Sequence, residues 1–73
     1  MNKTTTRTNL KLFRVSAGMT QQEFAAKIGC ARSTYALIEE GTRDGRVQFW
    51  NNLKTAFNIP AESMFDLMKC GNE

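Results

Sequence analysis

The segment from Thr20 to Gly29 constrains the fold more than any other part of the sequence, because it carries the marks of a short helix with two defined ends. Thr20 and Glu23 form a capping-box pattern, in which the threonine hydroxyl and the glutamate carboxylate each accept a hydrogen bond from a backbone N–H at the helix start. Gly29 ends the helix, since the tight turn that follows needs a residue that tolerates positive φ. The apolar residues between these ends follow a helical spacing: Phe24, Ala25 and Ile28.

Similar helix starts and stops recur along the chain, and no segment shows the alternation of apolar and polar residues that a half-buried strand needs. We expect four more helices, over residues 8–17, 31–40, 46–57 and 61–69. A chain of 73 residues is long enough for one domain. The sequence therefore predicts a single all-α domain of five helices.

The helical spacing also predicts which side chains face the core of this domain. The inward-facing residues expected on the first, third and fourth helices are Leu10, Phe13 and Ala17, then Tyr35 and Ile38, then Val47, Trp50, Leu53 and Phe57. Phe49 and three apolar residues of the last helix are expected to be mostly core: Met64, Phe65 and Met68. Leu67 is also apolar but points in a different direction from Met68. The last two helices nevertheless carry more apolar residues than one face can bury, and the excess is a candidate dimer surface.

Residues 1–7 are expected to form a flexible tail ahead of the domain at residues 8–70. Lys3 and Arg7 are interpreted as part of this soluble tail, with an arm that enters the minor groove of DNA as the alternative.

The residue types exclude several classes of function. Histidine is absent, and Cys30 and Cys70 are the only cysteines, so a zinc site with four Cys or His ligands is excluded. There is no activated nucleophile pair and no phosphate loop, so we expect neither an enzyme nor a bound cofactor. The N-terminus has no apolar leader and no apolar run is long enough to span a membrane. We therefore expect a cytoplasmic protein with reduced thiols.

The net charge of +3 is unevenly distributed. Residues 1–36 carry six basic side chains and one acidic one, whereas residues 37–73 carry four basic and six acidic ones. One end of the molecule could therefore face a polyanion such as DNA. An ordinary soluble protein with a solvated basic face would look similar, so the charge alone does not decide the function.

The second and third expected helices are joined by only a few residues around Gly29, which is the spacing of a helix-turn-helix. Ala25 has to be small because the third helix crosses close above it, and Tyr35 and Ile38 hold that helix to the core. The residues left to point outward from the first turns of the third helix are Ala31, Arg32, Ser33 and Leu37.

From Leu10 to Phe65 the chain resembles the Cro and phage-repressor type of helix-turn-helix domain, often called the XRE type. The resemblance rests on Thr20-Gln-x-x-Phe24-Ala25 followed by Ile38-Glu39-x-Gly41, with supporting matches at Ile28-Gly29 and Phe57-Asn58-Ile59. It implies a five-helix, lambda-repressor-like fold and a sequence-specific regulator of transcription that acts as a repressor. It also implies a palindromic operator in double-stranded DNA and a homodimer, at least on DNA.

The resemblance implies a role for individual residues. An ion pair between Arg14 and Glu39 would join the first and third helices, and would give Glu39 the cationic partner it needs near a helix C-terminus. The residues implied to read bases are Ala31, Arg32, Ser33 and Leu37, and those implied to contact phosphates are Gln21, Thr34, Thr42 and Arg43.

The sequence departs from the family pattern at three positions. Gly45 stands where proline is common, so we expect a more mobile loop; Lys54 stands where alanine is common; and Leu37 stands where polar base readers are common. An alternative function is an antitoxin or adaptor of the same fold that acts mainly through contacts of the last two helices with a protein partner.

Overall fold

The computed structural model describes residues 5–70, and within this range the chain is folded into helices without a strand. The helices are α1 (Thr8–Ser16), α2 (Gln21–Ile28), α3 (Arg32–Glu40), α4 (Val47–Phe57) and α5 (Ala61–Met68). The predicted all-α fold is confirmed, and the predicted bounds of the helices lie within one residue of those observed. None of the helices in the described range is long and apolar enough to cross a membrane.

The start and end of α2 are built as the sequence predicts. Thr20 Oγ1 accepts a hydrogen bond from the Glu23 backbone N–H at 3.1 Å, and Glu23 Oε1 accepts one from the Thr20 N–H at 2.9 Å. Gly29 closes the helix with φ +90°, in the left-handed region that favours glycine. The turn therefore brings α3 directly across the end of α2.

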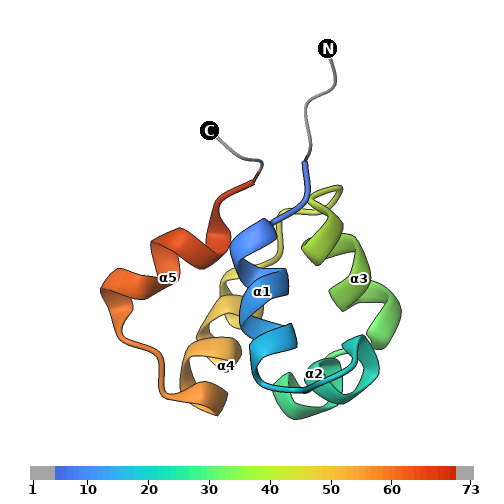
Figure 1. Ribbon diagram of the computed structural model, residues 1–73, viewed down its shortest axis with the longest axis horizontal. Helices are drawn as coiled ribbons and strands as arrows, with labels where there is room; N and C mark the ends of the chain where they lie inside the picture. The colour runs from blue at the N-terminus through green and yellow to red at the C-terminus, as the bar shows by residue number, and fades with distance from the viewer. Residues whose placement is uncertain (1–4, 71–73) are drawn as a thin grey trace.

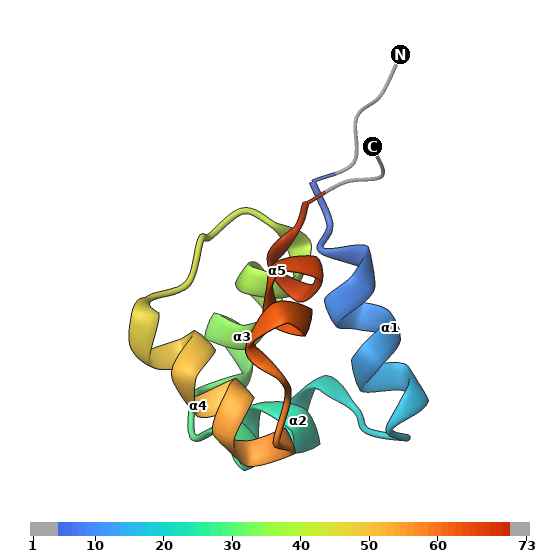
Figure 2. The same ribbon diagram turned by 90° about the vertical axis from the view of Figure 1, so that its left-hand side faces the viewer.

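The helices pack around one core that receives buried side chains from all five of them, and Figure 1 shows how they are arranged. Helix α1 packs against α3 and α5, whereas α2 packs against α3 and α4 (Figure 2). Ala25 is 1% exposed, in agreement with the close approach of α3 that its small side chain permits. The largest fully buried side chains come from four of the helices: Leu10, Phe24, Tyr35, Ile38 and Leu53.

Four expected core residues are instead exposed. Val47 is 76% exposed, since the buried face of α4 is formed by Phe49, Trp50 and Leu53, and Val47 in the first turn points away from it. Phe65 is 74% exposed because Met64 and Leu67 fill the inner face of α5. Ala17 is exposed because it lies at the cap beyond the last turn of α1. Met68, 37% exposed, lies at the margin of the core.

The expectation of a solvated tail up to residue 7 is wrong for Arg7. Its side chain is 5% exposed, and its guanidinium donates hydrogen bonds to backbone carbonyls of α3, α5 and the loop between α3 and α4. Lys3 lies outside the described residues.

Candidate nucleic-acid interface

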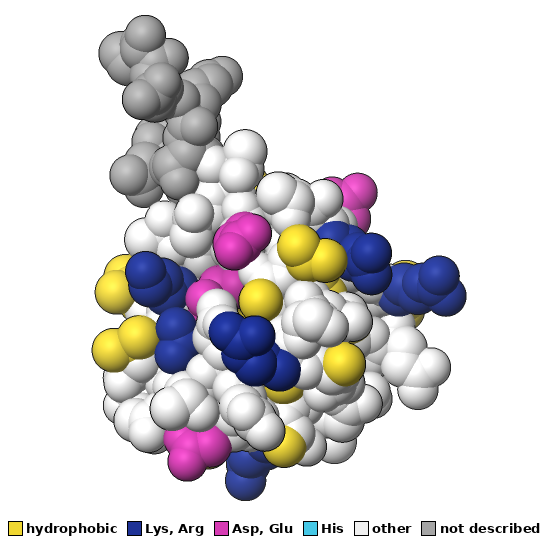
Figure 3. All heavy atoms as spheres, turned by 90° about the vertical axis from the view of Figure 1, so that its right-hand side faces the viewer, with side chains coloured by type: hydrophobic (Ala, Val, Ile, Leu, Met, Phe, Trp, Pro, Cys, Tyr) yellow, Lys and Arg dark blue, Asp and Glu magenta, His cyan; other side chains and the backbone are white. Residues whose placement is uncertain are grey.

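The outward face of α3 holds the four residues expected to read bases. Ala31 is the N-cap of α3 in an extended conformation, and Arg32 and Ser33 follow it in the first turn, all exposed. Leu37 lies one turn further along and is 37% exposed. On the opposite side of the helix Tyr35 and Ile38 are buried, so the core holds α3 by one face and leaves the other free. The surface on the α3 side of the molecule carries several Lys and Arg side chains, with apolar and acidic side chains between them (Figure 3).

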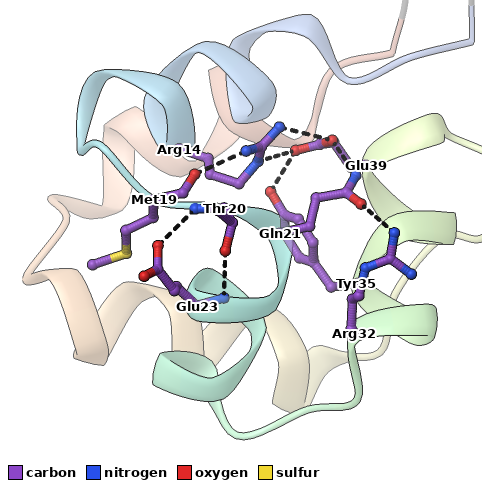
Figure 4. Close-up of polar contacts among 8 residues, drawn as sticks. All are labelled: Arg14, Met19, Thr20, Gln21, Glu23, Arg32, Tyr35 and Glu39. Atoms are coloured by element: carbon purple, nitrogen blue, oxygen red, sulfur yellow. Dashed lines mark hydrogen bonds and ion pairs between the residues drawn. The ribbon is translucent and has the colours of Figure 1, made fainter.

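A buried polar cluster around Glu39 fixes α3 relative to α1 and α2 (Figure 4). Arg14 Nε lies 2.8 Å from Glu39 Oε2, so the expected ion pair is present, and Arg14 Nη1 also donates to the Met19 carbonyl at 2.8 Å. The Tyr35 hydroxyl donates to Glu39 Oε2 at 2.8 Å, and Gln21 Nε2 donates to Glu39 Oε1 at 2.8 Å. One carboxylate therefore receives donors from three helices.

The cluster determines the charge state of its members. Burial alone would raise the pKa of the Glu39 carboxyl, but the hydrogen bonds from Arg14, Gln21 and Tyr35 outweigh burial and lower that pKa below its usual value. The hydrogen bond to Glu39 raises the pKa of Arg14. The pKa of Tyr35 is raised mainly by burial and, to a smaller extent, by its hydrogen bond to the Glu39 carboxylate. Glu39 is therefore an anion at neutral pH, and Arg14 and Tyr35 keep their protons.

Gln21 connects this cluster to the outward face of α3. Its side-chain N–H is donated to Glu39, which turns its carbonyl oxygen toward the exposed Arg32, and Arg32 Nη2 donates to that oxygen at 3.4 Å (Figure 4). Gln21 on α2, expected to contact a phosphate, and Arg32 on α3, expected to read a base, are thus neighbours.

The loop after α3 contains two more expected phosphate contacts, both exposed. The backbone N–H groups of Thr42 and Arg43 donate to the Leu37 carbonyl at 3.1 and 3.3 Å, so the loop folds back on the last turn of α3. Thr34 and Arg43 line one hollow of about 640 Å³ between α3 and the start of α4, whereas Gln21 does not line it. The structure therefore brings Thr34 together with the loop and leaves Gln21 beside Arg32.

Arg46 was missed by the sequence analysis. It is exposed at the N-cap of α4 and lines the same hollow as Arg43. The Arg-Asp-Gly-Arg segment at residues 43–46 could have indicated it, because two arginines in one short loop favour the binding of an anion. Gly45 between them has φ +84°, which proline cannot adopt, and a Cβ there would lie 2.9 Å from Trp50 Nε1. Glycine is therefore required by this loop conformation.

Neither cysteine is paired, and within residues 5–70 no group of three or more His, Cys, Asp and Glu residues is arranged to hold a metal ion. Cys30 is half-buried in the turn between α2 and α3, and burial raises the pKa of its thiol.

Comparison with known proteins agrees with this geometry. The helix-turn-helix family model matches residues 10–48. Two proteins of Archaeoglobus fulgidus, each named as an uncharacterized HTH-type transcriptional regulator, are 34% and 32% identical to this chain over 59 residues, which is 81% of this chain and 84% and 83% of theirs. No solved structure gives a significant match. The chain belongs to the XRE-type helix-turn-helix family of DNA-binding domains.

Proposed function

We propose that the protein is a transcriptional repressor that binds a palindromic operator as a homodimer and reads the major groove with α3. The observation that carries the proposal is the placement of Arg32, which is exposed in the first turn of a helix held to the core by Tyr35 and Ile38. A rigid helix with a free polar first turn is what entry into a major groove requires. The names of the two Archaeoglobus fulgidus relatives support a role in transcription.

Arg32 is proposed to read guanine, because the planar guanidinium fork can donate to O6 and N7 of the same base. Its bond to Gln21 is exposed and long at 3.4 Å, so Arg32 can leave it for a base at little cost. Leu37 has no polar atom on its side chain and suits the methyl group of thymine. Ala31 and Ser33 complete the reading face, since both are exposed beside Arg32.

Gln21, Thr34, Thr42 and Arg43 are proposed to contact phosphates on either side of the reading face. Such contacts hold the protein in register along the DNA without selecting a sequence. Arg43 is exposed in a loop whose backbone is tied to α3 through the Leu37 carbonyl. A cation on this loop is therefore held at a constant position relative to the bases.

The homodimer is proposed to form through α4 and α5. Val47 and Phe65 are 76% and 74% exposed, and both line a groove of about 380 Å³ between these helices. Exposed apolar side chains of this size favour burial against a partner. The molecule measures 36 × 26 × 24 Å, which is comparable to the spacing of about 34 Å that separates two recognition helices one turn of DNA apart.

The same apolar groove supports the second candidate function, an antitoxin or adaptor that binds another protein through α4 and α5. Selection of bound sequences from a random pool of double-stranded DNA separates the two. A repressor enriches a palindrome, and we propose that it does so in the cytoplasm, where operator DNA lies. If the protein is folded, as its sedimentation can show, and yet enriches no sequence, the result would favour the adaptor.

A further inference from the structure

Arg7 is a buried cation just ahead of α1, and it joins three parts of the molecule. Its Nη1 donates to the carbonyls of Ile38 at 2.6 Å and Arg43 at 2.9 Å, and its Nη2 donates to the Asp44 carbonyl at 3.3 Å. Its Nε donates to the Met68 carbonyl at 3.0 Å. One guanidinium therefore ties the loop between α3 and α4 to the ends of α3 and α5.

The surroundings explain how the charge of Arg7 is accommodated. Ile38 lies in the last turn of α3 and Met68 is the last residue of α5, so the guanidinium lies at the negative ends of two helices. The ring of Trp50 lies 5.3 Å from the guanidinium carbon. The contacts of the Arg7 guanidinium are thus backbone carbonyls and this ring, and their dipoles and π electrons stabilise its charge.

The backbone around Arg7 closes the same end of α3. The Arg7 N–H donates to the Glu39 carbonyl at 2.8 Å, and Thr5 Oγ1 donates to the Glu40 carbonyl at 2.8 Å. Gly41 begins the loop at φ +85°, and a Cβ at this position would collide with the Thr5 carbonyl. The segment Thr5–Arg7 thus lies across the point where the loop leaves α3, beside the end of α5 (Figures 1 and 2).

We propose that Arg7 is a positioning residue for DNA binding, because it holds the backbone of Arg43 and Asp44 so that the Arg43 side chain meets a phosphate. Arg7 itself is 5% exposed and cannot contact DNA. The effect on DNA binding rests on the proposed function. The clamp, by which we mean the bonds from Arg7 to the Arg43 and Asp44 carbonyls, is a property of the free protein. The two parts can therefore be tested separately.

The clamp is tested in the free protein with Arg7→Met, which keeps an unbranched apolar stem and removes every side-chain donor. Trp50 Nε1 still donates to the Asp44 carbonyl at 3.2 Å, so the loop keeps one anchor. Asn9→Ala is the matched control, since Asn9 donates to the Asp66 carbonyl of α5 at 3.1 Å and has no bond to the loop. The amide hydrogens of Thr42 and Arg43 are expected to exchange faster in Arg7→Met and unchanged in Asn9→Ala. Unchanged exchange in a folded Arg7→Met protein overturns the clamp.

The consequence for DNA is measured as the salt dependence of binding. Arg7→Met is expected to reduce the slope of log K against log salt by about 0.9 per protomer, the contribution of one phosphate contact, although the changed side chain is buried. Arg43→Ala is expected to give the same reduction, and the double variant no further one. If Arg43→Ala lowers the slope equally in both backgrounds, Arg7 does not position Arg43.

Arg7→Lys is the second variant, and it tests the proposal if Arg7→Met does not fold. A lysine keeps the positive charge between the two helix ends, but a compact ammonium group cannot bond the loop and α5 together as the guanidinium fork does. We expect a folded protein with faster loop exchange and a reduced salt slope. Wild-type values for both would overturn the proposal. A wild-type protein that binds no DNA would refute the proposed function, and the exchange measurement would still decide the clamp.

Discussion

Removal of Arg14 is predicted to destabilise the protein strongly, because it leaves the Glu39 carboxylate charged in a buried site. Glu39 is 4% exposed and would keep only the donors from Gln21 and Tyr35. Removal of one partner of a buried pair costs about 3–5 kcal/mol, and the two remaining donors place Arg14→Met near the lower limit of about 3 kcal/mol. For a domain of this size that loss lowers the melting temperature by about 12–24 °C.

The assay is urea denaturation of Arg14→Met, Glu39→Gln and the double variant. Glu39→Gln removes the charge, so the double variant should be at least as stable as Arg14→Met alone. The cycle also has a pH signature. The pKa of Glu39 is lowered in the folded protein, so its stabilisation is fully present above the unfolded value of about 4.3 and is lost as the pH falls through the folded value. Glu39→Gln should lose this acid dependence. Additive losses, or a cost of less than about 1 kcal/mol for Arg14→Met, would refute the assigned role.

Three further predictions concern separate parts of the molecule. Thr20→Ala removes the acceptor for the Glu23 N–H and should cost about 1 kcal/mol in urea denaturation; no change would mean that the capping box contributes nothing. Arg43→Ala should weaken binding to operator and scrambled DNA alike. When salt is raised from 50 to 200 mM, the factor by which affinity falls should be about 12-fold smaller for the variant dimer than for the wild-type dimer. Phe65→Ser, at a 74% exposed position, should leave the fold intact and prevent dimerisation on operator DNA, as sedimentation can show; an intact dimer would place the interface elsewhere.

Local signals were sufficient to predict the helices. Thr20 and Glu23 set the start of α2, and glycines follow the last residues of α2 and α3, through hydrogen bonds and φ values that involve near neighbours in the chain. The short turn at Gly29 then makes α3 cross α2. The exposure of Arg32 and Ser33 follows from the same local geometry, because Tyr35 and Ile38 determine the buried side of α3.

Long-range packing is what the sequence did not disclose. Arg7 reads as a soluble tail residue, and its burial depends on carbonyls of Ile38, Arg43 and Met68 that come together only in the folded chain. Val47 fits the helical spacing of α4, yet it is 76% exposed, whereas Phe49, also expected to be core, is buried. Spacing along one helix defines an apolar stripe, but the packing of other helices decides which edge of the stripe is covered.

The link from Glu39 through Gln21 to Arg32 was likewise not visible in the sequence. The resemblance assigned Gln21 to a phosphate, whereas in the free protein its amide group bonds Glu39 and Arg32. One N–H of the Gln21 side chain is used by Glu39 and a second remains for a phosphate, so the two roles are compatible. The phosphate contact of Gln21 stays a prediction.

Arg32→Ala tests the central claim, that α3 reads bases through its exposed first turn. The variant is titrated against a selected operator and a scrambled sequence of the same length at several salt concentrations. Loss of a bidentate contact to guanine should cost about 1–3 kcal/mol of discrimination per half-site, roughly 5- to 150-fold, with non-specific binding and its salt slope nearly unchanged. Equal loss of affinity for operator and scrambled DNA would make Arg32 a phosphate contact and would contradict the assigned reading face.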